Sequence, residues 1–368
     1  MLNKQTDEHW MLKAITLGEK GRITAPPNPW VGCVIVKDDQ LVGEDFHHAQ
    51  GEPHAEVLAL KEAGIKAQGS TVYVTLEPCC HYGHTPPCAD ALINAKVKKV
   101  VIALVDPDPR VAGKGIEKLR NAGIEVIKGI CENEAAKSLE PYLFHRKTGR
   151  AYCLVKAAMS MDGRTAAQDG SSQWITTSDI RANGHRLRHE SQAIMIGSGT
   201  ALADHPKLTV RDLTVPVLRQ PLRVVLDARG RLKPEGALFD THLAPTLVIT
   251  TNQAAEKNIK AWKDSGVEVK VVQESKNGCG VDLKSVLELL GGRGIIQVLV
   301  EGGATLMGSL LEEKLINRFK IHIGPRILGS KGKPLFGWDG PTSIELAPVL
   351  QLNSVQQFGN CVELDYSM

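Results

Sequence analysis

Four residues in the first half of the chain have the types and the spacing needed to hold and use a zinc ion. His54 and Glu56 lie two positions apart, and Cys79 and Cys88 follow downstream. One imidazole and two thiolates would leave a fourth zinc position open for water, which is typical of a catalytic site. Zinc lowers the pKa of bound water towards neutrality, and a nearby carboxylate can transfer the proton. The pattern therefore predicts metal-assisted hydrolysis with Glu56 as the catalytic acid and base.

The order of these residues matches the zinc-deaminase signature, H-x-E followed by P-C-x-x-C, in which the glutamate is not a ligand. One feature departs from it, because eight residues instead of two separate Cys79 from Cys88. The insert begins with Cys80, which could take a ligand position in place of one of the other two. A metal-free alternative, a helix-capping histidine beside two unrelated buried thiols, does not explain why Glu56 and Pro78 stand at signature positions.

The remaining cysteines do not indicate a disulfide scaffold. Eight cysteines in 368 residues are too few for one, and clustered thiols in a cytoplasmic chain indicate metal ligands or reactive groups. The isolated cysteines are expected to be small buried core residues, and they are Cys33, Cys131, Cys153, Cys279 and Cys361.

Longer stretches around the signature are more specific than the signature itself. They are residues 27–29, 31–36, 51–56, 75–81, 85–88 and 106–109. These stretches resemble the deaminase half of the bacterial bifunctional riboflavin-biosynthesis deaminase-reductases, and the resemblance covers residues 1–146. It implies a cytidine-deaminase-like zinc domain with His54, Cys79 and Cys88 as the ligands.

The resemblance also implies the substrate of this half, a diaminopyrimidinone that carries a phosphoribosylamino group. Asn28, His47 and His81 are the implied substrate contacts. The sequence departs from the family at His84, where the family usually has Lys or Arg suited to the substrate phosphate. An imidazole is only partly charged near neutral pH, so this position supplies less positive charge.

The second half contains two glycine-rich turns that could hold a phosphate. Residues 197–200 and 302–305 each follow an apolar run and precede an expected helix. Glycine lets the backbone approach a phosphate, and the N-terminus of the helix offers free N–H groups. Tight packing of a strand against a helix is an equal alternative for either turn. No G-x-G-x-x-G motif is present, so the standard dinucleotide-binding fingerprint is not supported.

These turns and their surroundings resemble the reductase half of the same family. The matching stretches are residues 160–165, 174–176, 199–204, 208–211 and 300–303. The resemblance implies a dihydrofolate-reductase-like fold and NADPH as the cofactor. The implied reaction is hydride transfer to C1 of the ribose, opened to its imine or aldehyde form, which gives a ribityl chain.

The same resemblance implies the residues of the reductase site. The implied cofactor contacts are Ala158, Trp174, Thr200, Asp204, Gly303, Ala304, Thr305, Leu306, Met307, Gly308 and Ser309. The implied substrate contacts are Ser172, Arg188, Leu208, Arg211 and Glu301. Arg188 and Arg211 suit a phosphate because a guanidinium group forms paired hydrogen bonds with it. Lys156 and Asp204 are the polar candidates for assisting proton transfer in the catalytic step.

The elements that must position these residues alternate between short apolar strands and helical patterns, which indicates a two-domain α/β architecture. In the first half we expect strands at 31–36, 71–76, 100–105 and 124–127, with helices at 53–63, 89–95, 115–121 and 132–140. In the second half we expect strands at 152–158, 193–196, 223–227, 247–251, 267–272, 295–300 and 318–323, with helices at 178–190, 253–264, 282–290 and 304–312. Residues 141–150 interrupt the pattern, so we expect domains at 1–146 and 151–368.

Composition and charge exclude several classes of protein. The net charge is only +3 and is spread over both halves, so no basic surface for nucleic acid is expected. The longest apolar runs are too short to cross a bilayer, and the N-terminus does not resemble a secretory signal. We therefore expect a cytoplasmic homo-oligomer that acts on a small molecule and binds neither nucleic acid nor membrane.

Two other functions remain open at this point. The first is a nucleoside or tRNA deaminase with an accessory α/β domain, which would release ammonia from those substrates without oxidising NADPH. The second is a zinc-stabilised binding protein that has lost its chemistry. An intact Glu56 and an open fourth zinc position argue against the second function.

Overall fold

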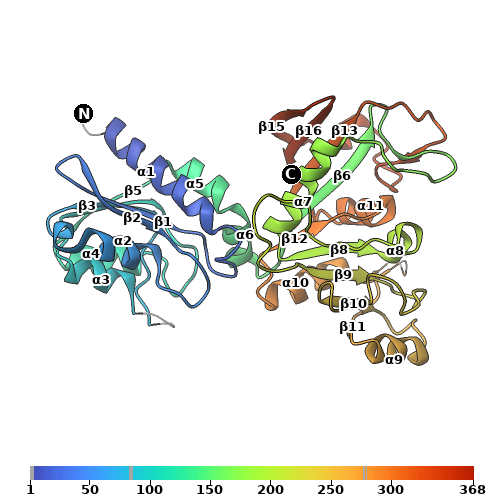
Figure 1. The fold of residues 1–368 in the computed structure, drawn as a ribbon, viewed down its shortest axis with the longest axis horizontal. Coiled ribbons are helices and arrows are strands. Elements are labelled where there is room, and N and C mark those ends of the chain that lie inside the picture. The colour runs from blue at the N-terminus through green and yellow to red at the C-terminus, as the bar shows by residue number, and fades with distance from the viewer. Residues whose placement is uncertain (1–3, 83–85, 277, 279) are drawn as a thin grey trace. The chain divides into compact units, whose positions relative to one another are not determined.

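Two large sheets built from short aliphatic strands form the framework of the protein (Figure 1). The computed structural model describes residues 4–82, 86–276, 278 and 280–368. The chain divides into two units, Met1–Gly149 and Arg150–Met368, and each sheet belongs to one of them. No helix among the described residues is long and apolar enough to span a membrane.

The first unit contains a five-stranded sheet in the order β2-β1-β3-β4-β5. Its strands are β1 (Gly32–Lys37), β2 (Gln40–Phe46), β3 (Thr71–Leu76), β4 (Lys99–Leu104) and β5 (Glu125–Lys128). Strand β1 is antiparallel to β2 and β3, whereas β3, β4 and β5 run parallel. The central strands are buried along nearly their whole length because helices cover both faces.

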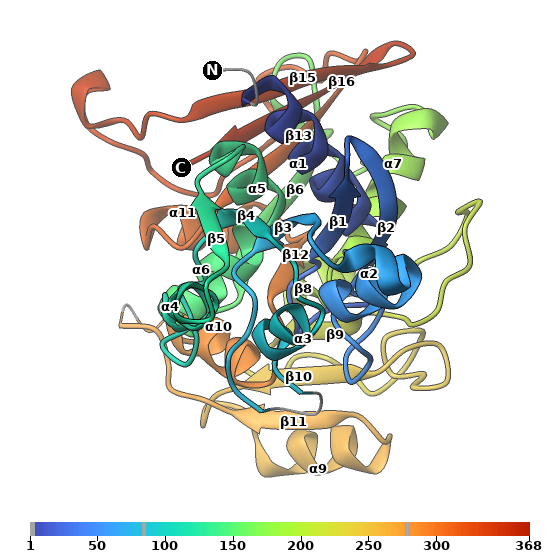
Figure 2. The same ribbon diagram turned by 90° about the vertical axis from the view of Figure 1, so that its left-hand side faces the viewer.

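The described part of this unit contains six α-helices, which pack around the sheet (Figures 1 and 2). They are α1 (Lys4–Gly18), α2 (Ala55–Ala63), α3 (Cys88–Asn94), α4 (Lys114–Asn121), α5 (Glu132–Ser138) and α6 (Glu140–Thr148). Helices α1 and α5 lie on one face of the sheet, and α2, α3 and α4 lie on the other. Helices α2 and α3 both begin beside the end of β3, which brings the zinc-type residues together.

The sequence-based prediction missed three elements of this unit. The stretch 141–150, where the pattern was expected to break, is mostly helix α6, and Leu139 separates that helix from α5. Pro141 does not prevent the helix because it lies in the first turn, where its missing N–H group has no partner to lose. Helix α1 and strand β2 were not predicted.

The second unit contains a nine-stranded sheet in the order β11-β10-β9-β8-β12-β6-β13-β16-β15. Its strands are β6 (Tyr152–Ser160), β8 (Ala193–Gly197), β9 (Leu222–Leu226), β10 (Thr246–Thr250), β11 (Glu268–Val271), β12 (Gln297–Val300), β13 (Arg318–Gly324), β15 (Gln351–Phe358) and β16 (Cys361–Ser367). The seven strands from β11 to β13 pair in parallel, and the β15–β16 hairpin adds an antiparallel edge. A separate small sheet pairs β7 (Arg164–Ala166) with β14 (Lys333–Pro334).

Helices pack on both faces of this sheet. They are α7 (Ser178–Glu190), α8 (Ser198–Asp204), α9 (Glu256–Asp264), α10 (Leu283–Gly292) and α11 (Ala304–Glu312). One core cluster joins Val224 and Leu226 to α10 and α11, and a second joins Val225 to α8 and α9. Successive side chains of β9 therefore pack into cores on opposite faces of the sheet, as expected for a strand buried on both faces.

The expected strands and helices of the second half correspond to described elements, and the helix expected after the first glycine-rich turn is α8, which begins within that turn at Ser198. The structure adds β7, β14 and the β15–β16 hairpin. The hairpin escaped prediction because most residues of β15 are exposed and polar, so it lacks an apolar run. Of the cysteines expected in cores, Cys33, Cys153 and Cys361 are buried, Cys131 is only half-buried, and Cys279 lies outside the described residues.

Candidate active sites

The zinc-type residues converge at the ends of two helices and a strand. His54 is the residue before α2, Cys88 is the first residue of α3, and Cys79 follows β3. Their candidate ligand atoms all lie within 4.8 Å of one another. The His54 Nδ1 is 3.2 Å from the Cys88 Sγ and 3.6 Å from the Cys79 Sγ. One imidazole and two thiols so close together fit a zinc ion, which takes such a donor set.

The pKa values of the two cysteines also suit the binding of a metal cation. The hydrogen bond between the two cysteines lowers the pKa of Cys79 to about 4, with further lowering by His54 and the Cys88 backbone N–H, and burial opposes this shift. The pKa of Cys88 is raised because its hydrogen bond with Cys79 favours its protonated form. Cys79 therefore carries a thiolate at neutral pH, and a bound metal would replace the shared proton.

Glu56 lies in the first turn of α2, and its side chain is only 3% exposed. Burial raises the pKa of Glu56 above its usual range. A carboxyl group whose pKa lies closer to neutrality both accepts and donates a proton more readily at pH 7. Cys80, the alternative ligand, is not in the converging group, and its Sγ lies 3.6 Å from the Arg110 carbonyl oxygen.

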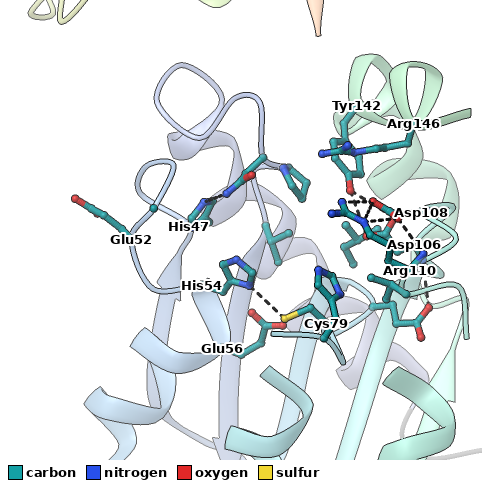
Figure 3. A pocket seen from close by; sticks show the side chains of 18 residues that line it. His47, Glu52, His54, Glu56, Cys79, Asp106, Asp108, Arg110, Tyr142 and Arg146 are labelled. Carbon is teal, nitrogen blue, oxygen red and sulfur yellow. Dashed lines mark hydrogen bonds and ion pairs between the residues drawn. The ribbon is translucent and has the colours of Figure 1, made fainter. Parts of the chain in front are cut away.

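His54, Glu56 and Cys79 line a cleft of about 210 Å³ (Figure 3). Asn28, His47 and His81, the expected substrate contacts, line the same cleft. The His47 Nε2 is 3.1 Å from the Asn28 amide nitrogen, and its Nδ1 is 3.2 Å from the Pro53 carbonyl oxygen. This arrangement requires the neutral tautomer with Nδ1–H donating to Pro53, and burial accordingly lowers the pKa of His47.

His81 offers a further polar atom to the cleft. Its Nδ1 is buried and has no hydrogen-bond partner among the described residues. His84 lies outside the described residues. The opposite wall of the cleft was not predicted from the sequence, and it consists of Asp106, Asp108, Arg110, Tyr142 and Arg146.

Three cavities formed by described residues of the second unit share lining residues. The first, of about 680 Å³, and the second, of about 450 Å³, both touch Lys156, Thr200, Asp204 and Glu301. The third, of about 390 Å³, shares Gly197, Gly199, Thr305 and Leu306 with the second. The cavities thus follow one another past the carboxyl ends of β8 and β12, the edge of a parallel sheet where ligands bind.

Most of the expected cofactor contacts line the second cavity. They are Ala158, Thr200, Asp204, Gly303, Ala304, Thr305, Leu306 and Met307. Ser309 lines the third cavity. Gly308 lines none of the three, and a Cβ at Gly308 would lie 2.5 Å from the Gly337 carbonyl oxygen, so the close packing there requires glycine.

Two expected contacts lie in a cavity other than the one their role implies. Trp174, expected at the cofactor, lines the first cavity, where the Arg181 guanidinium lies 4.3 Å from the ring centre. Ser172, expected at the substrate, lines the second cavity. The other expected substrate contacts line the first cavity, and they are Arg188, Leu208, Arg211 and Glu301.

The two arginines expected to bind phosphate differ in their partners. Arg188 is held by Glu301 through two hydrogen bonds of 2.6 and 2.7 Å and by the Thr209 carbonyl oxygen at 3.0 Å. Arg211 pairs with Asp212 at 3.5 Å, and its side chain is 49% exposed. Arg211 is therefore the more available of the two for a phosphate, and Arg188 orients Glu301.

Charges meet where the first and second cavities join. Burial would raise the pKa of Glu301, but Arg188 and Lys156 outweigh burial and hold it at about 2. Burial lowers the pKa of Lys156 and raises that of Asp204. The junction therefore brings together Glu301, which stays ionised, and two groups, Lys156 and Asp204, whose pKa values are shifted towards neutrality.

Several lining residues were missed by sequence reasoning. Arg181, His185 and Lys207 line the first cavity, and Arg229 and Arg231 line the third. The Arg231 Nη2 donates a 2.6 Å hydrogen bond to the Ser198 Oγ, next to the first glycine-rich turn. The available signal for Arg229 and Arg231 was their position just after a parallel strand, where binding loops occur.

A buried carboxylate beside a converging His-Cys-Cys group defines the first unit as a zinc-type hydrolase of the deaminase class. A chain of cavities along the carboxyl edge of a parallel sheet defines the second as a cofactor-dependent enzyme domain. Family models agree with both descriptions. Residues 4–104 match the "Cytidine and deoxycytidylate deaminase zinc-binding region", and residues 151–364 match the "RibD C-terminal domain".

Relatives match the whole chain. The riboflavin biosynthesis protein RibD of Chlamydia pneumoniae is 49% identical, over 96% of this chain and 94% of that protein. The Acinetobacter baumannii RibD structure is 42% identical, covers 99% of both chains and superposes with a TM-score of 0.89. A Thermotoga maritima diaminohydroxyphosphoribosylaminopyrimidine deaminase / 5-amino-6-(5-phosphoribosylamino)uracil reductase is 33% identical, over 99% of both chains, with a TM-score of 0.86.

The chain belongs to the RibD family of bifunctional riboflavin-biosynthesis enzymes. It joins a zinc-binding deaminase domain to a reductase domain with a dihydrofolate-reductase-like fold.

Proposed function

We propose that the first unit deaminates 2,5-diamino-6-(5-phosphoribosylamino)pyrimidin-4-one and that the second reduces the product, 5-amino-6-(5-phosphoribosylamino)uracil, with NADPH. The observation that carries this proposal is the convergence of His54, Cys79 and Cys88 beside Glu56, in a chain that also contains three connected cavities. The Thermotoga maritima relative is named for both activities, which supports this choice of substrates.

In the first unit, His54, Cys79 and Cys88 would hold zinc, which makes hydroxide available near pH 7. Glu56 accepts a proton from the attacking water as the new C–O bond forms, and delivers it to the amino nitrogen as the C–N bond breaks, so that the ring carbon becomes a carbonyl and ammonia leaves. The raised pKa of Glu56 suits both transfers. Asn28, His47 and His81 orient the pyrimidine through hydrogen bonds from the wall of the cleft.

In the second unit, NADPH would supply the hydride for C1 of the opened ribose. Glu301, fixed by Arg188, accepts hydrogen bonds from the substrate, and Arg211 contacts its phosphate. Lys156 and Asp204 lie where the first and second cavities join, so we assign them substrate orientation and the supply of the accompanying proton.

The third cavity supports NADPH as the cofactor. The glycine-rich turns line the second and third cavities and would hold the phosphates of a dinucleotide there, which leaves the third cavity for the adenosine end. Arg229 and Arg231 there give a positive wall that suits the additional phosphate of NADPH. Homo-oligomeric assembly, a cytoplasmic location and the lack of a nucleic-acid partner remain predictions from the sequence.

The test uses the full-length enzyme with the diaminopyrimidinone substrate, with and without NADPH, following ammonia and NADPH absorbance separately. Wild type should release ammonia in both cases and oxidise NADPH only after deamination. Glu56→Gln should slow ammonia release by about a hundredfold to ten-thousandfold, the usual contribution of a general acid and base. Zinc content and reduction of deaminated substrate should not change.

Glu62→Gln is the matched control, because Glu62 is an exposed carboxylate on the same helix. It should behave as wild type. If Glu56→Gln released ammonia at the wild-type rate, the assignment of Glu56 would be rejected. If wild type released no ammonia from this substrate, the proposed substrate would be rejected.

A further inference from the structure

The deaminase cleft has to bind a substrate that carries a phosphate, and its own cations indicate where that phosphate lies. This inference rests on the proposed substrate. Among the described residues that line the cleft, only Arg110 and Arg146 carry a permanent positive charge. Both belong to the wall opposite His47 and His54 (Figure 3).

Arg110 is already occupied. Its Nη2 lies 2.6 Å from the Asp108 Oδ2, and its Nε lies 3.0 and 3.2 Å from the two carboxylate oxygens. This hydrogen-bonded pair holds the pKa of Asp108 at about 2. Asp108 therefore stays ionised at neutral pH and neutralises Arg110. A phosphate would have to compete with a carboxylate that is already in place.

Arg146 differs from Arg110 in this respect. It lies on α6, makes no ion pair with any described acidic residue, and its Nε is buried without a hydrogen-bond partner among the described residues. Its guanidinium carbon lies 5.1 Å from the centre of the Tyr142 ring. Contact with an aromatic face holds a guanidinium in a defined plane.

The acids on this wall have other hydrogen-bond partners, although the charge of Arg146 favours the ionised forms of both Asp106 and Asp108. The Asp106 carboxylate accepts hydrogen bonds from the Tyr142 hydroxyl, at 3.2 and 3.4 Å, and from the Asp108 backbone N–H at 2.9 Å. Tyr142 thus contacts Asp106 with its hydroxyl and Arg146 with its ring. The wall therefore presents one oriented guanidinium, Arg146, which interacts with the Tyr142 side chain and keeps a buried Nε without a hydrogen-bond partner among the described residues.

We propose that Arg146 binds the phosphate of the deaminase substrate. With the pyrimidine ring beside Glu56, the ribose extends across the cleft towards the wall of α6, and the phosphate accepts paired hydrogen bonds from the guanidinium. This assignment supplies, from α6, the charge that His84 supplies less fully than the Lys or Arg usual in the family.

The experiment compares Arg146→Gln with wild type on two substrates, the phosphorylated diaminopyrimidinone and its dephosphorylated counterpart. A charge-assisted hydrogen bond contributes about 1.5–3 kcal/mol, so kcat/KM for the phosphorylated substrate should fall about tenfold to a hundredfold, mainly through KM. For the dephosphorylated substrate kcat/KM should stay at the wild-type value. Arg146→Lys, which keeps the charge but not the paired donors, should lose less.

Lys147→Gln is the matched control, because Lys147 is the next residue of α6 and is exposed. It should behave as wild type with both substrates. Zinc content, melting temperature and reductase rate report whether the variants fold. If Arg146→Gln misfolds, two other measurements test the proposal. The first is kcat/KM of Arg146→Lys with both substrates. The second is inhibition of wild-type deamination, where ribose 5-phosphate should inhibit far better than ribose.

An equal loss with both substrates, or no loss with the phosphorylated one, would overturn the assignment of Arg146 and leave the proposed function intact. Equal inhibition of wild type by ribose and ribose 5-phosphate would also overturn it. A wild-type enzyme that does not deaminate the phosphorylated compound would remove the proposed function as well, so the two failures can be told apart.

Discussion

Glu56, Glu301 and Glu363 are all buried carboxylates, yet their pKa values move in different directions. Burial raises the pKa of Glu56, whereas cationic neighbours hold those of Glu301 and Glu363 at about 2. A carboxyl group that exchanges protons near pH 7 needs burial, which raises its pKa. A carboxylate that only holds a partner needs cationic neighbours, which keep it ionised. Single residues in this chain are therefore distinguished by their neighbours, which the local sequence does not reveal.

Glu363 gives a prediction about acid stability. Its carboxylate accepts hydrogen bonds of 2.9 Å from both Lys320 and His322. These contacts outweigh the effect of burial and lower its pKa from 4.5 to about 2. Because the folded-state pKa is the lower one, this stabilisation is complete above pH 4.5 and is lost as the pH falls to about 2.

We therefore expect the free energy of unfolding of wild type to fall, relative to Glu363→Gln, by at most about 3 kcal/mol between about pH 6 and about pH 2. Urea unfolding of both proteins across this range measures the difference. Glu312→Gln, at an exposed carboxylate of α11, should follow wild type. A constant difference between wild type and Glu363→Gln at all pH values would contradict the prediction.

Helix α1 shows how an element that was not predicted supports the deaminase site. It packs on β1 and β3, the strands next to the zinc-type residues. The contact requires glycine, because a Cβ at Gly32 would lie 2.0 Å from the Ala14 carbonyl oxygen and 2.7 Å from the Gly18 nitrogen. Both are backbone atoms, so no side-chain rotation can make room.

Gly32→Ala should consequently lower the free energy of unfolding of the first unit by at least about 2 kcal/mol, as for other insertions into a close-packed core. Ammonia release should fall with it, and the reductase rate should not. Gly292→Ala is the control, because a Cβ at Gly292 meets no atom within 4 Å and alanine favours a helix. Thermal unfolding compares the variants, and equal melting of Gly32→Ala and wild type would exclude the close contact.

The sequence predicted the elements that carry a strong pattern and missed those stabilised by tertiary contacts. The apolar runs of β3, β4 and β12 were recognised because both faces of those strands are buried. Helix α6 was missed because residues 141–150 lack an apolar pattern, and β15 because its residues are mainly exposed. Local pattern cannot reveal an element whose stability comes from its neighbours in space.

The same distinction holds for the sites. His54, Glu56, Cys79 and Cys88 follow a short signature with a chemical reason for each residue, so they could be found in the sequence. Arg146 and Arg231 belong to no such signature. They reach the sites from α6 and from the loop after β9, which only the fold brings there.

Over the whole molecule, each unit has its own core and its own site. The described metal-type group lies entirely in the first unit, and the clusters around α8 to α11 lie in the second. The two activities should therefore respond separately to loss of metal.

Treatment with a zinc chelator, followed by its removal, should abolish ammonia release and leave NADPH oxidation with deaminated substrate unchanged. Added zinc should restore ammonia release, and added magnesium should not, because thiolate and imidazole ligands favour zinc. Measured metal content should follow the deaminase rate. Loss of both activities on chelation would show that the reductase also depends on the metal.

The wall shared by the first and second cavities links their occupants thermodynamically. Lys156, Thr200, Asp204 and Glu301 face both spaces, so whatever lies in one cavity changes the surface that the other presents. Such coupling is reciprocal, because the factor by which the cofactor changes the affinity for substrate equals the factor by which substrate changes the affinity for cofactor. A substitution in this wall that changes the coupling must therefore change it by the same factor for both ligands.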